Sequence, residues 1–390
     1  MTRHALLALA LSAAAGCTAE TSADPAAPGS RPKAAAQEFA SRQGAYRVIE
    51  VANGLRTPWA VAFLPDGRFL VTERTGHLRI VTADGTVSAA LSGVPAVFAE
   101  GQGGLLDVAL SPDFANDQLV YLSYAEASPD GGAPAGTAAA RGRLHDDALV
   151  DVEVIYRQQP KLSRSNHFGS RFVFDDTGHL FITQGDNGER PSAQDMDKLQ
   201  GKLVRLHPDG RVPVDNPFVG REGVRAEIYS LGHRNMQGAA LHPLTRALWI
   251  SEHGPRGGDE INIPQAGKNY GWPIITHGIN YSGFKIPEAV GNEKEGMEQP
   301  HHVWMKSPGL SGMAFASAES AWKGNLFLGA LADRELIRLE LDGDRIVGEE
   351  RLLGEIKARI RDVREGPDGN LYVVTDDSNG KLLRIEPPRG

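Results

Sequence analysis

Residues 59–72 read W-A-V-A-F-L-P-D-G-R-F-L-V-T, which is an apolar run, a turn of Pro, Asp and Gly, and a second apolar run ending in threonine. Short apolar runs separated by such turn residues are typical of two antiparallel strands. Five further copies of this theme are Leu105–Ser123, Phe168–Thr183, Gln237–Ser251, Leu310–Gly329 and Arg361–Thr375. The sequence therefore predicts six related β-hairpins.

Several hairpins are followed by a second pair of apolar runs. Examples are His77–Val81 with Val87–Leu91, and Leu336–Leu341 with Arg345–Glu350. About four strands per unit, at an irregular spacing of roughly 45 to 75 residues, indicate an all-β, six-bladed β-propeller with inserted loops. Because a ring has to close, we expect the leftover strand at Tyr46–Val51 to complete the last blade. Tandem β-sandwiches are the alternative, but hairpin and outer pair recur in a fixed order.

The composition fits this fold and excludes one class of partner. The 390 residues include 45 Gly and 24 Pro, spread along the chain, which favours many short strands joined by turns. The net charge of -8 argues against nucleic acid as a partner, since a phosphate backbone is held by clustered Lys and Arg. We expect one propeller domain over residues 45–390.

The N-terminus predicts export. Residues 1–16 combine a short basic start, an apolar run and small residues directly before Cys17, the single cysteine. This pattern resembles a lipoprotein-type signal peptide, in which the cysteine is lipidated and anchors the exported protein to a bacterial membrane from the periplasm. An ordinary signal peptide cleaved nearby is the alternative. Residues 17–44, rich in Ala, Pro and Ser, are predicted to be a flexible tether.

Residues 232–264 concentrate the polar chemistry. A loop of hydrogen-bonding side chains at 232–237 precedes the fourth hairpin, and residues 252–260 are predicted to be a Gly-rich acidic loop. Free carbonyls and carboxylates in such a loop are the oxygen ligands that calcium prefers.

Ligands of propellers lie over the central channel at one end, so polar residues in equivalent places of the units should converge. The candidates are Gln102, Asn166, His167, Asp186, Arg234, Asn235, Gln237, Gly254, Pro255, Arg359 and Arg361. Arg359 and Arg361 alternate and share one face of a strand, which suits an anionic ligand with carboxylates. Asp186 can orient His167 as a general base. Taken singly, the arginines fit a solvated face, and the His–Asp pair fits a structural hydrogen bond.

Five motifs stand out along the chain. They are G-Q-G-G-L-L-D-V-A-L-S-P-D-F, G-H-R-N-M-Q-G, E-H-G-P-R-G-G-D-E-I-N, K-N-Y-G-W-P and R-I-R-D-V-R-E-G-P-D-G-N-L-Y-V-V-T-D. With these motifs the chain resembles, in order from about Val51 to the C-terminus, the soluble PQQ-dependent sugar dehydrogenases, a glucose and aldose dehydrogenase family of six-bladed propellers.

This resemblance implies a quinoprotein that oxidises the anomeric carbon of an aldose to a lactone. The cofactor would be pyrroloquinoline quinone (PQQ), with calcium as a Lewis acid. By motif position, His167 corresponds to the general base, Asp186 to its supporting carboxylate, and Arg234 to the residue beside the reactive carbonyl of the quinone. The remaining correspondences are Asn235, Gln237, Arg359 and Arg361 for the cofactor, Gln102 and Asn166 for the sugar, Gly254 and Pro255 for the calcium under the quinone, and Glu260 and Tyr270 for a second calcium region.

Two positions depart from the family pattern. Ala332 stands where the glucose dehydrogenases place a lysine against the cofactor, and Asn166 stands where they have an aspartate beside the base. The resemblance therefore implies an aldose dehydrogenase of broad specificity rather than a strict glucose enzyme. No C-x-x-C-H haem motif occurs in this one-cysteine chain, so we expect an external electron acceptor, a diffusible quinone or a small cytochrome.

Two rival functions remain open at this stage. A calcium-dependent lactonase would need side-chain carboxylates and amides in the channel, where this sequence offers arginines. A non-catalytic propeller that binds carbohydrate or a partner would share the architecture, but it would have no need of the His–Asp pair.

Overall fold

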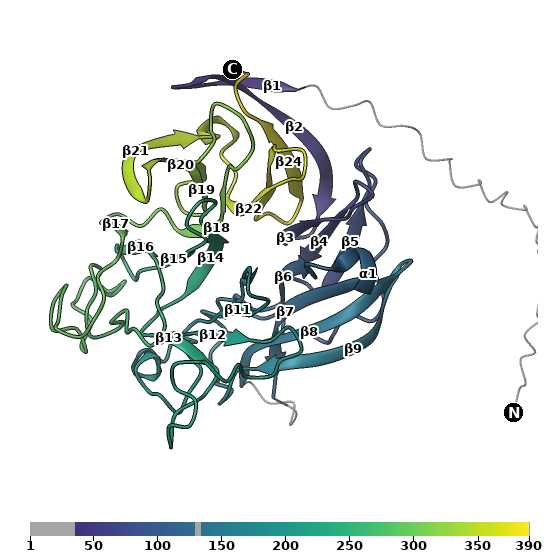
Figure 1. Cartoon of the computed structure of the whole chain (residues 1–390). Coiled ribbons are helices and arrows are strands. Elements are labelled where there is room, and N and C mark those ends of the chain that lie inside the picture. Colours follow the sequence, from purple (N-terminus) through teal and green to yellow (C-terminus); the bar gives the residue numbers. More distant parts are fainter. Residues whose placement is uncertain (1–35, 129–133, 390) are drawn as a thin grey trace, which may run out of the picture. The chain divides into compact units, whose positions relative to one another are not determined.

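A computed structural model describes residues 36–128 and 134–389 of the chain. Six antiparallel sheets are arranged around a common centre (Figure 1). Each of the six predicted hairpins forms the inner two strands of one sheet. The prediction of an all-β, six-bladed propeller is therefore confirmed.

The strands follow one another blade by blade. The first sheet contains β3 (Pro58–Phe63), β4 (Phe69–Glu73) and β5 (His77–Val81). The second contains β6 (Leu105–Leu110), β7 (Leu119–Ala127), β8 (Ala135–His145) and β9 (Ala148–Arg157). The third contains β10 (Phe172–Phe174), β11 (Leu180–Thr183), β12 (Lys202–Leu206) and β13 (Ile228–Leu231). The fourth sheet contains β14 (Met236–Leu241), β15 (Leu248–Glu252), β16 (Asp259–Asn262) and β17 (His302–Trp304). The fifth contains β18 (Leu310–Phe315), β19 (Leu326–Ala330), β20 (Glu335–Asp342) and β21 (Arg345–Leu352). The last contains β22 (Ile360–Glu365), β23 (Leu371–Thr375), β24 (Gly380–Glu386), β2 (Gly44–Leu55) and β1 (Gln37–Ser41).

Helical structure is limited to short turns within this framework. They are α1 (Phe114–Asp117), and the 3₁₀ turns η1 (Arg190–Ala193) and η2 (Gly354–Ile356). No helix in the described part of the chain has the length and apolarity that a membrane crossing requires.

The first sheet differs from the expectation of four strands. Residues 87–91 follow β5 but form no regular strand, although the N–H groups of Ser88 and Leu91 donate to the carbonyls of Ile80 and Leu78 at 2.9 Å each. The first strand of the predicted outer pair, His77–Val81, is therefore confirmed as β5, but the second, Val87–Leu91, is wrong. That segment is joined to β5 by an isolated bridge between Val81 and Val87 and by separate hydrogen bonds, not by a continuous ladder. The predicted outer pair of the fifth blade is confirmed as β20 and β21.

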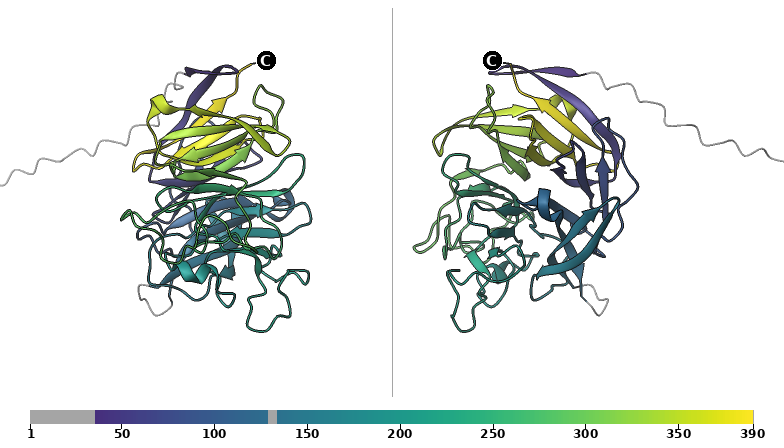
Figure 2. Two further views of the ribbon diagram at one scale, coloured as in Figure 1. Left: turned by 90° about the vertical axis from the view of Figure 1, so that its left-hand side faces the viewer. Right: turned by 45° about the vertical axis from the view of Figure 1, so that its right-hand side comes forward.

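The ring is closed by the N-terminal strand. β2 pairs antiparallel with β24, and Val48 lies opposite Ile385, as the leftover strand predicted. The side views show β2, in purple, beside β24, in yellow (Figure 2). β1 adds a further strand outside β2. The flexible tether predicted over 17–44 is thus wrong for residues 37–44, where the ring of Phe39 packs on Tyr46 at 5.6 Å. The predicted signal peptide, Cys17 and the rest of the tether lie outside the described residues.

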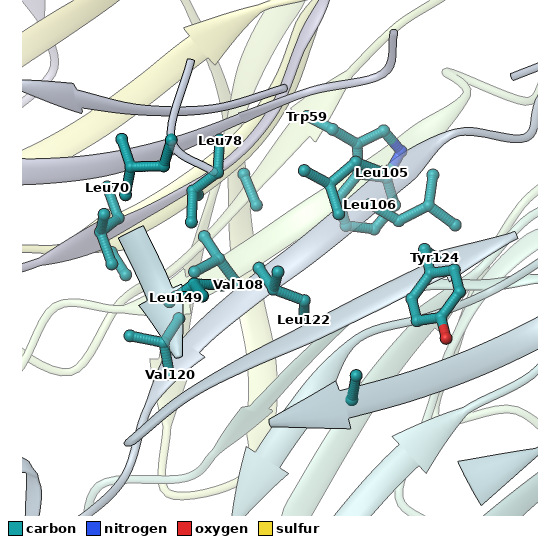
Figure 3. Packing of buried hydrophobic residues seen from close by; sticks show 14 of the residues in the cluster. Trp59, Leu70, Leu78, Leu105, Leu106, Val108, Val120, Leu122, Tyr124 and Leu149 are labelled. Atoms are coloured by element: carbon teal, nitrogen blue, oxygen red, sulfur yellow. The ribbon is translucent and has the colours of Figure 1, made fainter. Parts of the chain in front are cut away.

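Neighbouring blades bury their apolar faces against one another. Between the first two blades, Leu70 and Leu78 pack with Val108, Leu122 and Leu149 (Figure 3). Each buried side chain of this size contributes about 1.5–3 kcal/mol. This packing stacks the sheets so that the inner strands meet at the centre of the ring.

Candidate active site

A pocket of about 800 Å³ lies over the starts of the inner strands β6, β14 and β22. Its charged lining consists of five cationic side chains and two carboxylates: Arg74, Arg256, Lys306, Arg359, Arg361, Asp259 and Asp376. The whole chain carries a net charge of -8, so this cationic excess is local. An anionic ligand would therefore be attracted to the pocket.

Most of the predicted site residues converge here. The pocket is lined by Gln102, Asn235, Gln237, Gly254, Pro255, Ala332, Arg359 and Arg361. A small second pocket of about 20 Å³ shares Gly254 and Pro255 with the first and is lined by Arg234, Glu260 and Tyr270. Asn166, His167 and Asp186 line neither pocket, although the next residues, Phe168 and Gly169, line the larger one.

His167 and Asp186 form a close pair. His167 Nδ1 lies 2.6 Å from Asp186 Oδ1, and Trp272 Nε1 donates to Asp186 Oδ2 at 2.8 Å. This arrangement assigns the Nδ1 proton to the bond with Asp186 and leaves Nε2 as the free acceptor. Gln102 Oε1 accepts the His167 backbone N–H at 2.9 Å, so Gln102 holds the loop that carries the histidine.

His167 sits in a strained backbone conformation. Its φ is 56°, in the left-handed region that residues other than glycine seldom adopt. A side chain at Gly185 would overlap the His167 carbonyl, so glycine is required there for the close approach of the two loops. Strain of this kind is concentrated at functional sites.

The electrostatics keep His167 neutral. Burial lowers the pKa of His167, the charge of Arg234 lowers it further, and the hydrogen bond with Asp186 opposes both. Burial would raise the pKa of Asp186, but the hydrogen bond with His167 and the charge of Arg234 hold it below its usual value. A neutral imidazole beside an ionised carboxylate is the protonation state of a general base.

Arg234 is fixed in the wall of the small pocket. Its backbone N–H donates to Glu252 Oε2 at 2.7 Å, its Nη1 donates to the His253 carbonyl at 3.1 Å, and its guanidinium lies 5.4 Å from the Trp272 ring centroid. Its Nε is buried and has no hydrogen-bond partner in the described part of the chain.

A chain of hydrogen bonds links three of the cofactor candidates in the lining of the pocket, Asn235, Gln237 and Arg361. Asn235 Oδ1 accepts from Gly169 N–H and from Gln237 Nε2, both at 3.1 Å. Gln237 Oε1 in turn accepts from Arg361 Nη1 at 3.1 Å. The third, fourth and sixth blades thus meet at this point.

Arg359 and Arg361 share one carboxylate. Arg359 Nη2 lies 2.9 Å and Arg361 Nη2 lies 3.1 Å from the same atom, Asp376 Oδ2. Burial would raise the pKa of Asp376, but the two arginines hold it below its usual value. Arg361 Nε is buried and has no hydrogen-bond partner among the described residues. Two guanidiniums with one counter-ion therefore leave donors available for a ligand carboxylate.

The Gly254–Pro255 turn offers backbone oxygens. Neither carbonyl accepts a hydrogen bond within the described ranges. Asp259 holds the turn, because its Oδ1 accepts Gly254 N–H at 3.0 Å. Residues 36–128 and 134–389 contain no cluster of three His, Cys, Asp or Glu side chains placed to hold a metal ion, so a cation here would depend on carbonyls. The predicted loop at 252–260 is shorter than expected, since Glu252 ends β15 and Asp259 begins β16.

Glu260 and Tyr270 differ in what they can offer a metal. Burial and the neighbouring Glu252 raise the pKa of Glu260 well above its usual value. The Tyr270 hydroxyl is already occupied, because it donates to the Ile263 carbonyl at 2.7 Å and accepts from Gln265 N–H at 3.1 Å. Asn262 Nδ2 donates to Glu260 Oε1 at 3.0 Å, so the other carboxyl oxygen of Glu260 is the atom of these two side chains best able to bind a metal ion.

Three site residues were missed at the level of sequence. They are Trp272, which bonds Asp186; Asp376, which pairs both arginines; and Glu252, which holds the Arg234 backbone. Trp272 stands in the K-N-Y-G-W-P motif, and Asp376 directly follows β23 in T-D-D, so both positions carried a signal. No local pattern marks Glu252 as an anchor.

Fold and pocket define a β-propeller protein with a cationic pocket over the starts of its inner strands. The family model described as Glucose / Sorbosone dehydrogenase matches residues 55–384. The chain therefore belongs to this family of sugar dehydrogenases, and its predicted identity as an oxidoreductase of that family is confirmed.

The relatives agree with this assignment. Aldose sugar dehydrogenase YliI of Escherichia coli is 56% identical over 335 residues, which cover 85% of this chain and 90% of the relative. The soluble aldose sugar dehydrogenase of Escherichia coli in its apo-form superimposes with a TM-score of 0.86 at 55% identity, covering 88% of this chain and 100% of the other. The PQQ-bound form of the aldose sugar dehydrogenase of Streptomyces coelicolor gives a TM-score of 0.72 at 30% identity, with coverage of 91% and 100%.

Proposed function

We propose that this protein oxidises aldoses at the anomeric carbon to lactones, with PQQ as cofactor and calcium at the Gly254–Pro255 turn. The observation that carries the proposal is the His167–Asp186 pair, 2.6 Å apart, beside a pocket with an excess of arginine. The similarity to an aldose sugar dehydrogenase and to a PQQ-bound homologue supports it.

The residues present fit this cofactor. PQQ carries three carboxylates and, when bound, would supply an ortho-quinone that accepts a hydride from C1 of the sugar, and this hydride carries both electrons of the oxidation. Arg359 and Arg361 would hold carboxylates of PQQ, and Asn235 and Gln237 would hydrogen-bond to polar atoms at the edge of its ring system. Gly254 and Pro255 present free carbonyl oxygens, which are ligands suited to calcium.

The protein's own side chains supply the proton transfer. His167 Nε2 accepts the proton of the C1 hydroxyl, while Asp186 holds the tautomer and stabilises the imidazolium that forms. Arg234 adds positive charge beside this pair. Gln102 and Asn166 are the proposed sugar contacts, and Gln102 also positions the His167 loop.

Three finer parts of the proposal follow from the sequence. Ala332 lines the pocket without a charge, so cofactor affinity is expected to be lower than with a lysine there. Glu260 and Tyr270 mark a second calcium region, with the Glu260 carboxylate as its side-chain ligand.

The electrons pass to an external acceptor, a diffusible quinone or small cytochrome. Sustained turnover with PQQ, calcium and sugar but no acceptor would contradict this.

The deciding experiment is dye reduction by the purified apo-protein with glucose or another aldose. PQQ and calcium are added separately and together, and His167→Ala is measured alongside. Activity that needs both additions and is lost in the variant, while PQQ binding by titration is kept, is the expected result. PQQ binding without turnover of any aldose would show that the substrate class is wrong.

The rival functions have distinct outcomes in the same assay. A lactonase would hydrolyse lactones with calcium alone, and a binding propeller would retain carbohydrate without turnover. The part of the chain that the structure describes offers no carboxylate cluster for a lactonase calcium site.

Export remains a proposal based on residues 1–17. We propose cleavage before Cys17, lipidation of that cysteine and attachment to a bacterial membrane facing the periplasm. Mass spectrometry of the mature N-terminus tests it, since an unmodified N-terminus downstream of Cys17 would indicate an ordinary signal peptide.

A further inference from the structure

Arg171 is a buried arginine that the proposed chemistry does not use. Its side chain is 2% exposed, and its backbone N–H donates to Thr183 Oγ1 at 2.8 Å, which attaches it to the third hairpin. An ionised guanidinium is costly to bury unless its donors are paired. The partners of Arg171 therefore show what the residue is for.

Two of these partners belong to the pocket. Arg171 Nε donates to the Gln237 carbonyl at 2.8 Å, and Nη2 donates to the Arg361 carbonyl at 3.1 Å. Gln237 and Arg361 line the pocket, and their side chains bond one another at 3.1 Å. One guanidinium thus holds the backbones of two pocket residues that come from different blades.

Two carboxylates balance the charge. Arg171 Nη1 lies 3.3 Å from Asp107 Oδ1 and 2.9 Å from Asp362 Oδ1. Arg364 reaches the same pair, at 2.6 Å from Asp107 Oδ1 and 3.0 Å from Asp362 Oδ2. Burial lowers the pKa of Arg171, and the two carboxylates oppose this. The cluster consists of two arginines and two aspartates, so its net charge is zero.

The first and fifth blades also meet this cluster. The Arg171 Cζ lies 4.0 Å from the centroid of the Trp59 ring, which lines the pocket. A side chain at Gly312 would overlap Asp362 Oδ1 and lie 2.9 Å from Arg171 Nη2, so only glycine fits. Each of the other five blades therefore brings at least one residue against Arg171, namely Trp59, Asp107, Gln237, Gly312 and Asp362 in blade order. The inner strands of the blades surround the centre in Figure 1.

We propose that Arg171 is a positioning residue of the cofactor site. It sets the backbone positions of Gln237 and Arg361 relative to one another, so that their side chains together receive the ligand. The identity of this ligand as PQQ rests on the proposed function. Lysine cannot replace the arginine, because Nε, Nη1 and Nη2 each serve a different partner in fixed planar geometry.

The test compares Arg171→Lys with a matched control, Arg338→Lys. Arg338 is equally buried, with 0% exposure, and pairs with Glu340 and Glu350 at 2.7 and 2.5 Å, but it does not line the pocket. PQQ titration in the presence of calcium should give a Kd at least about tenfold higher for Arg171→Lys, and within about twofold of wild type for Arg338→Lys. Equal losses in both variants would reduce Arg171 to a purely structural residue and overturn the proposal.

Hydrogen exchange of the ligand-free protein separates this inference from the proposed function. Faster exchange at residues 235–239 and 359–363 in Arg171→Lys, with no change there in Arg338→Lys, is expected. Hydrogen exchange tests the role of Arg171 even if the wild type fails to bind PQQ. Failure of the wild type to bind PQQ would contradict the proposed function but not the positioning role of Arg171. Unchanged exchange at both segments would overturn the inference.

A second variant covers the case in which Arg171→Lys does not fold. Gly312→Ala adds a single methyl group against Asp362 and Arg171 from the fifth blade. It should raise the Kd for PQQ in the same direction, without touching a residue that lines the pocket. Wild-type affinity in folded Gly312→Ala would contradict the proposal.

Discussion

His167 combines a strained backbone with a neutral side chain. Its φ of 56° points the imidazole toward Asp186, and the Gln102 amide oxygen holds the peptide in place. The strain is tolerated because Gly185 allows the neighbouring loop to approach. Gln102 and Gly185 therefore affect the position of the His167 backbone, whereas burial, Asp186 and Arg234 affect the pKa of its side chain. The two properties can be tested separately.

The first prediction concerns the pH dependence of turnover. The base form of His167 is required, and its pKa lies below 6.5 in the folded protein because of burial and Arg234. The acid limb of kcat/KM should therefore rise with pH and have its midpoint below 6.5, reaching a plateau by neutral pH. Steady-state kinetics of the reconstituted protein between about pH 4.5 and pH 8 measure this. A midpoint above 6.5 would contradict a neutral, desolvated base.

At the scale of elements, the start of β22 explains how two arginines reach one pocket. Arg359 and Arg361 are two residues apart and both pair with Asp376, while Ile360 between them is fully buried on the other side. Both charges therefore reach one carboxylate, although the register of β22 against β23 shifts between Ile360 and Asp362.

The second prediction concerns the strand that closes the ring. Tyr46 of β2 is buried, its hydroxyl accepts Leu353 N–H at 3.1 Å, and its ring packs on Trp322 at 5.5 Å. Tyr46→Phe should lower the free energy of unfolding by about 1–3 kcal/mol, because the Leu353 N–H loses its partner. Urea denaturation measures the change. The control Tyr281→Phe, on a side chain that is 74% exposed, should stay within about 0.5 kcal/mol of wild type.

At the scale of the whole molecule, the blades are joined by packing, hydrogen bonds and buried ion pairs. The chain has one cysteine, so no internal disulfide connects the blades. Global stability should therefore respond to buried charges and to ligands that bind across blades.

The third prediction concerns Lys202. It is fully buried, and its Nζ donates to the carbonyls of Ser192 and Gln200 at 2.8 Å each. Burial lowers its pKa from 10.5 to about 7. Between these two values the unfolded chain binds a proton that the folded chain does not, so this group makes the free energy of unfolding rise with pH, by at most about 1.4 kcal/mol per unit.

Urea denaturation from about pH 7 to about pH 9.5 tests this slope. In Lys202→Met the contribution should disappear, whatever the absolute stability of the variant. Lys323→Met, which changes a half-exposed lysine paired with Glu319, should keep it. An identical slope in wild type and Lys202→Met would show that the buried amine stays charged.

The fourth prediction concerns ligand linkage. Because the proposed site draws on the third, fourth and sixth blades, PQQ with calcium should raise Tm, with a stabilisation of about 2.7 kcal/mol at a hundredfold excess over Kd. Differential scanning calorimetry measures this, and removal of calcium by a chelator should reverse it. No shift at a ligand concentration far above Kd would contradict binding of PQQ to the folded protein.

The sequence by itself determined the local elements. The alternation of apolar runs and turns specified six hairpins and the closing strand, since these depend on side-chain periodicity and turn residues within about 15 positions. The sequence likewise predicted that Arg359 and Arg361 share one face of a strand and that His167 and Asp186 flank one hairpin. The expected strand at 87–91 and the tether at 37–44 were wrong, because pairing with a neighbour, not local composition, decides whether such segments become strands.

Only the tertiary structure decided which distant residues meet. Asp376 joins two arginines, Trp272 holds Asp186 from 86 positions away, and Arg171 joins blades whose residues are 64 to 190 positions apart. No periodicity encodes such contacts, since they arise when six stacked sheets close into a ring. A buried arginine is stable there only because all the blades bring partners to one point.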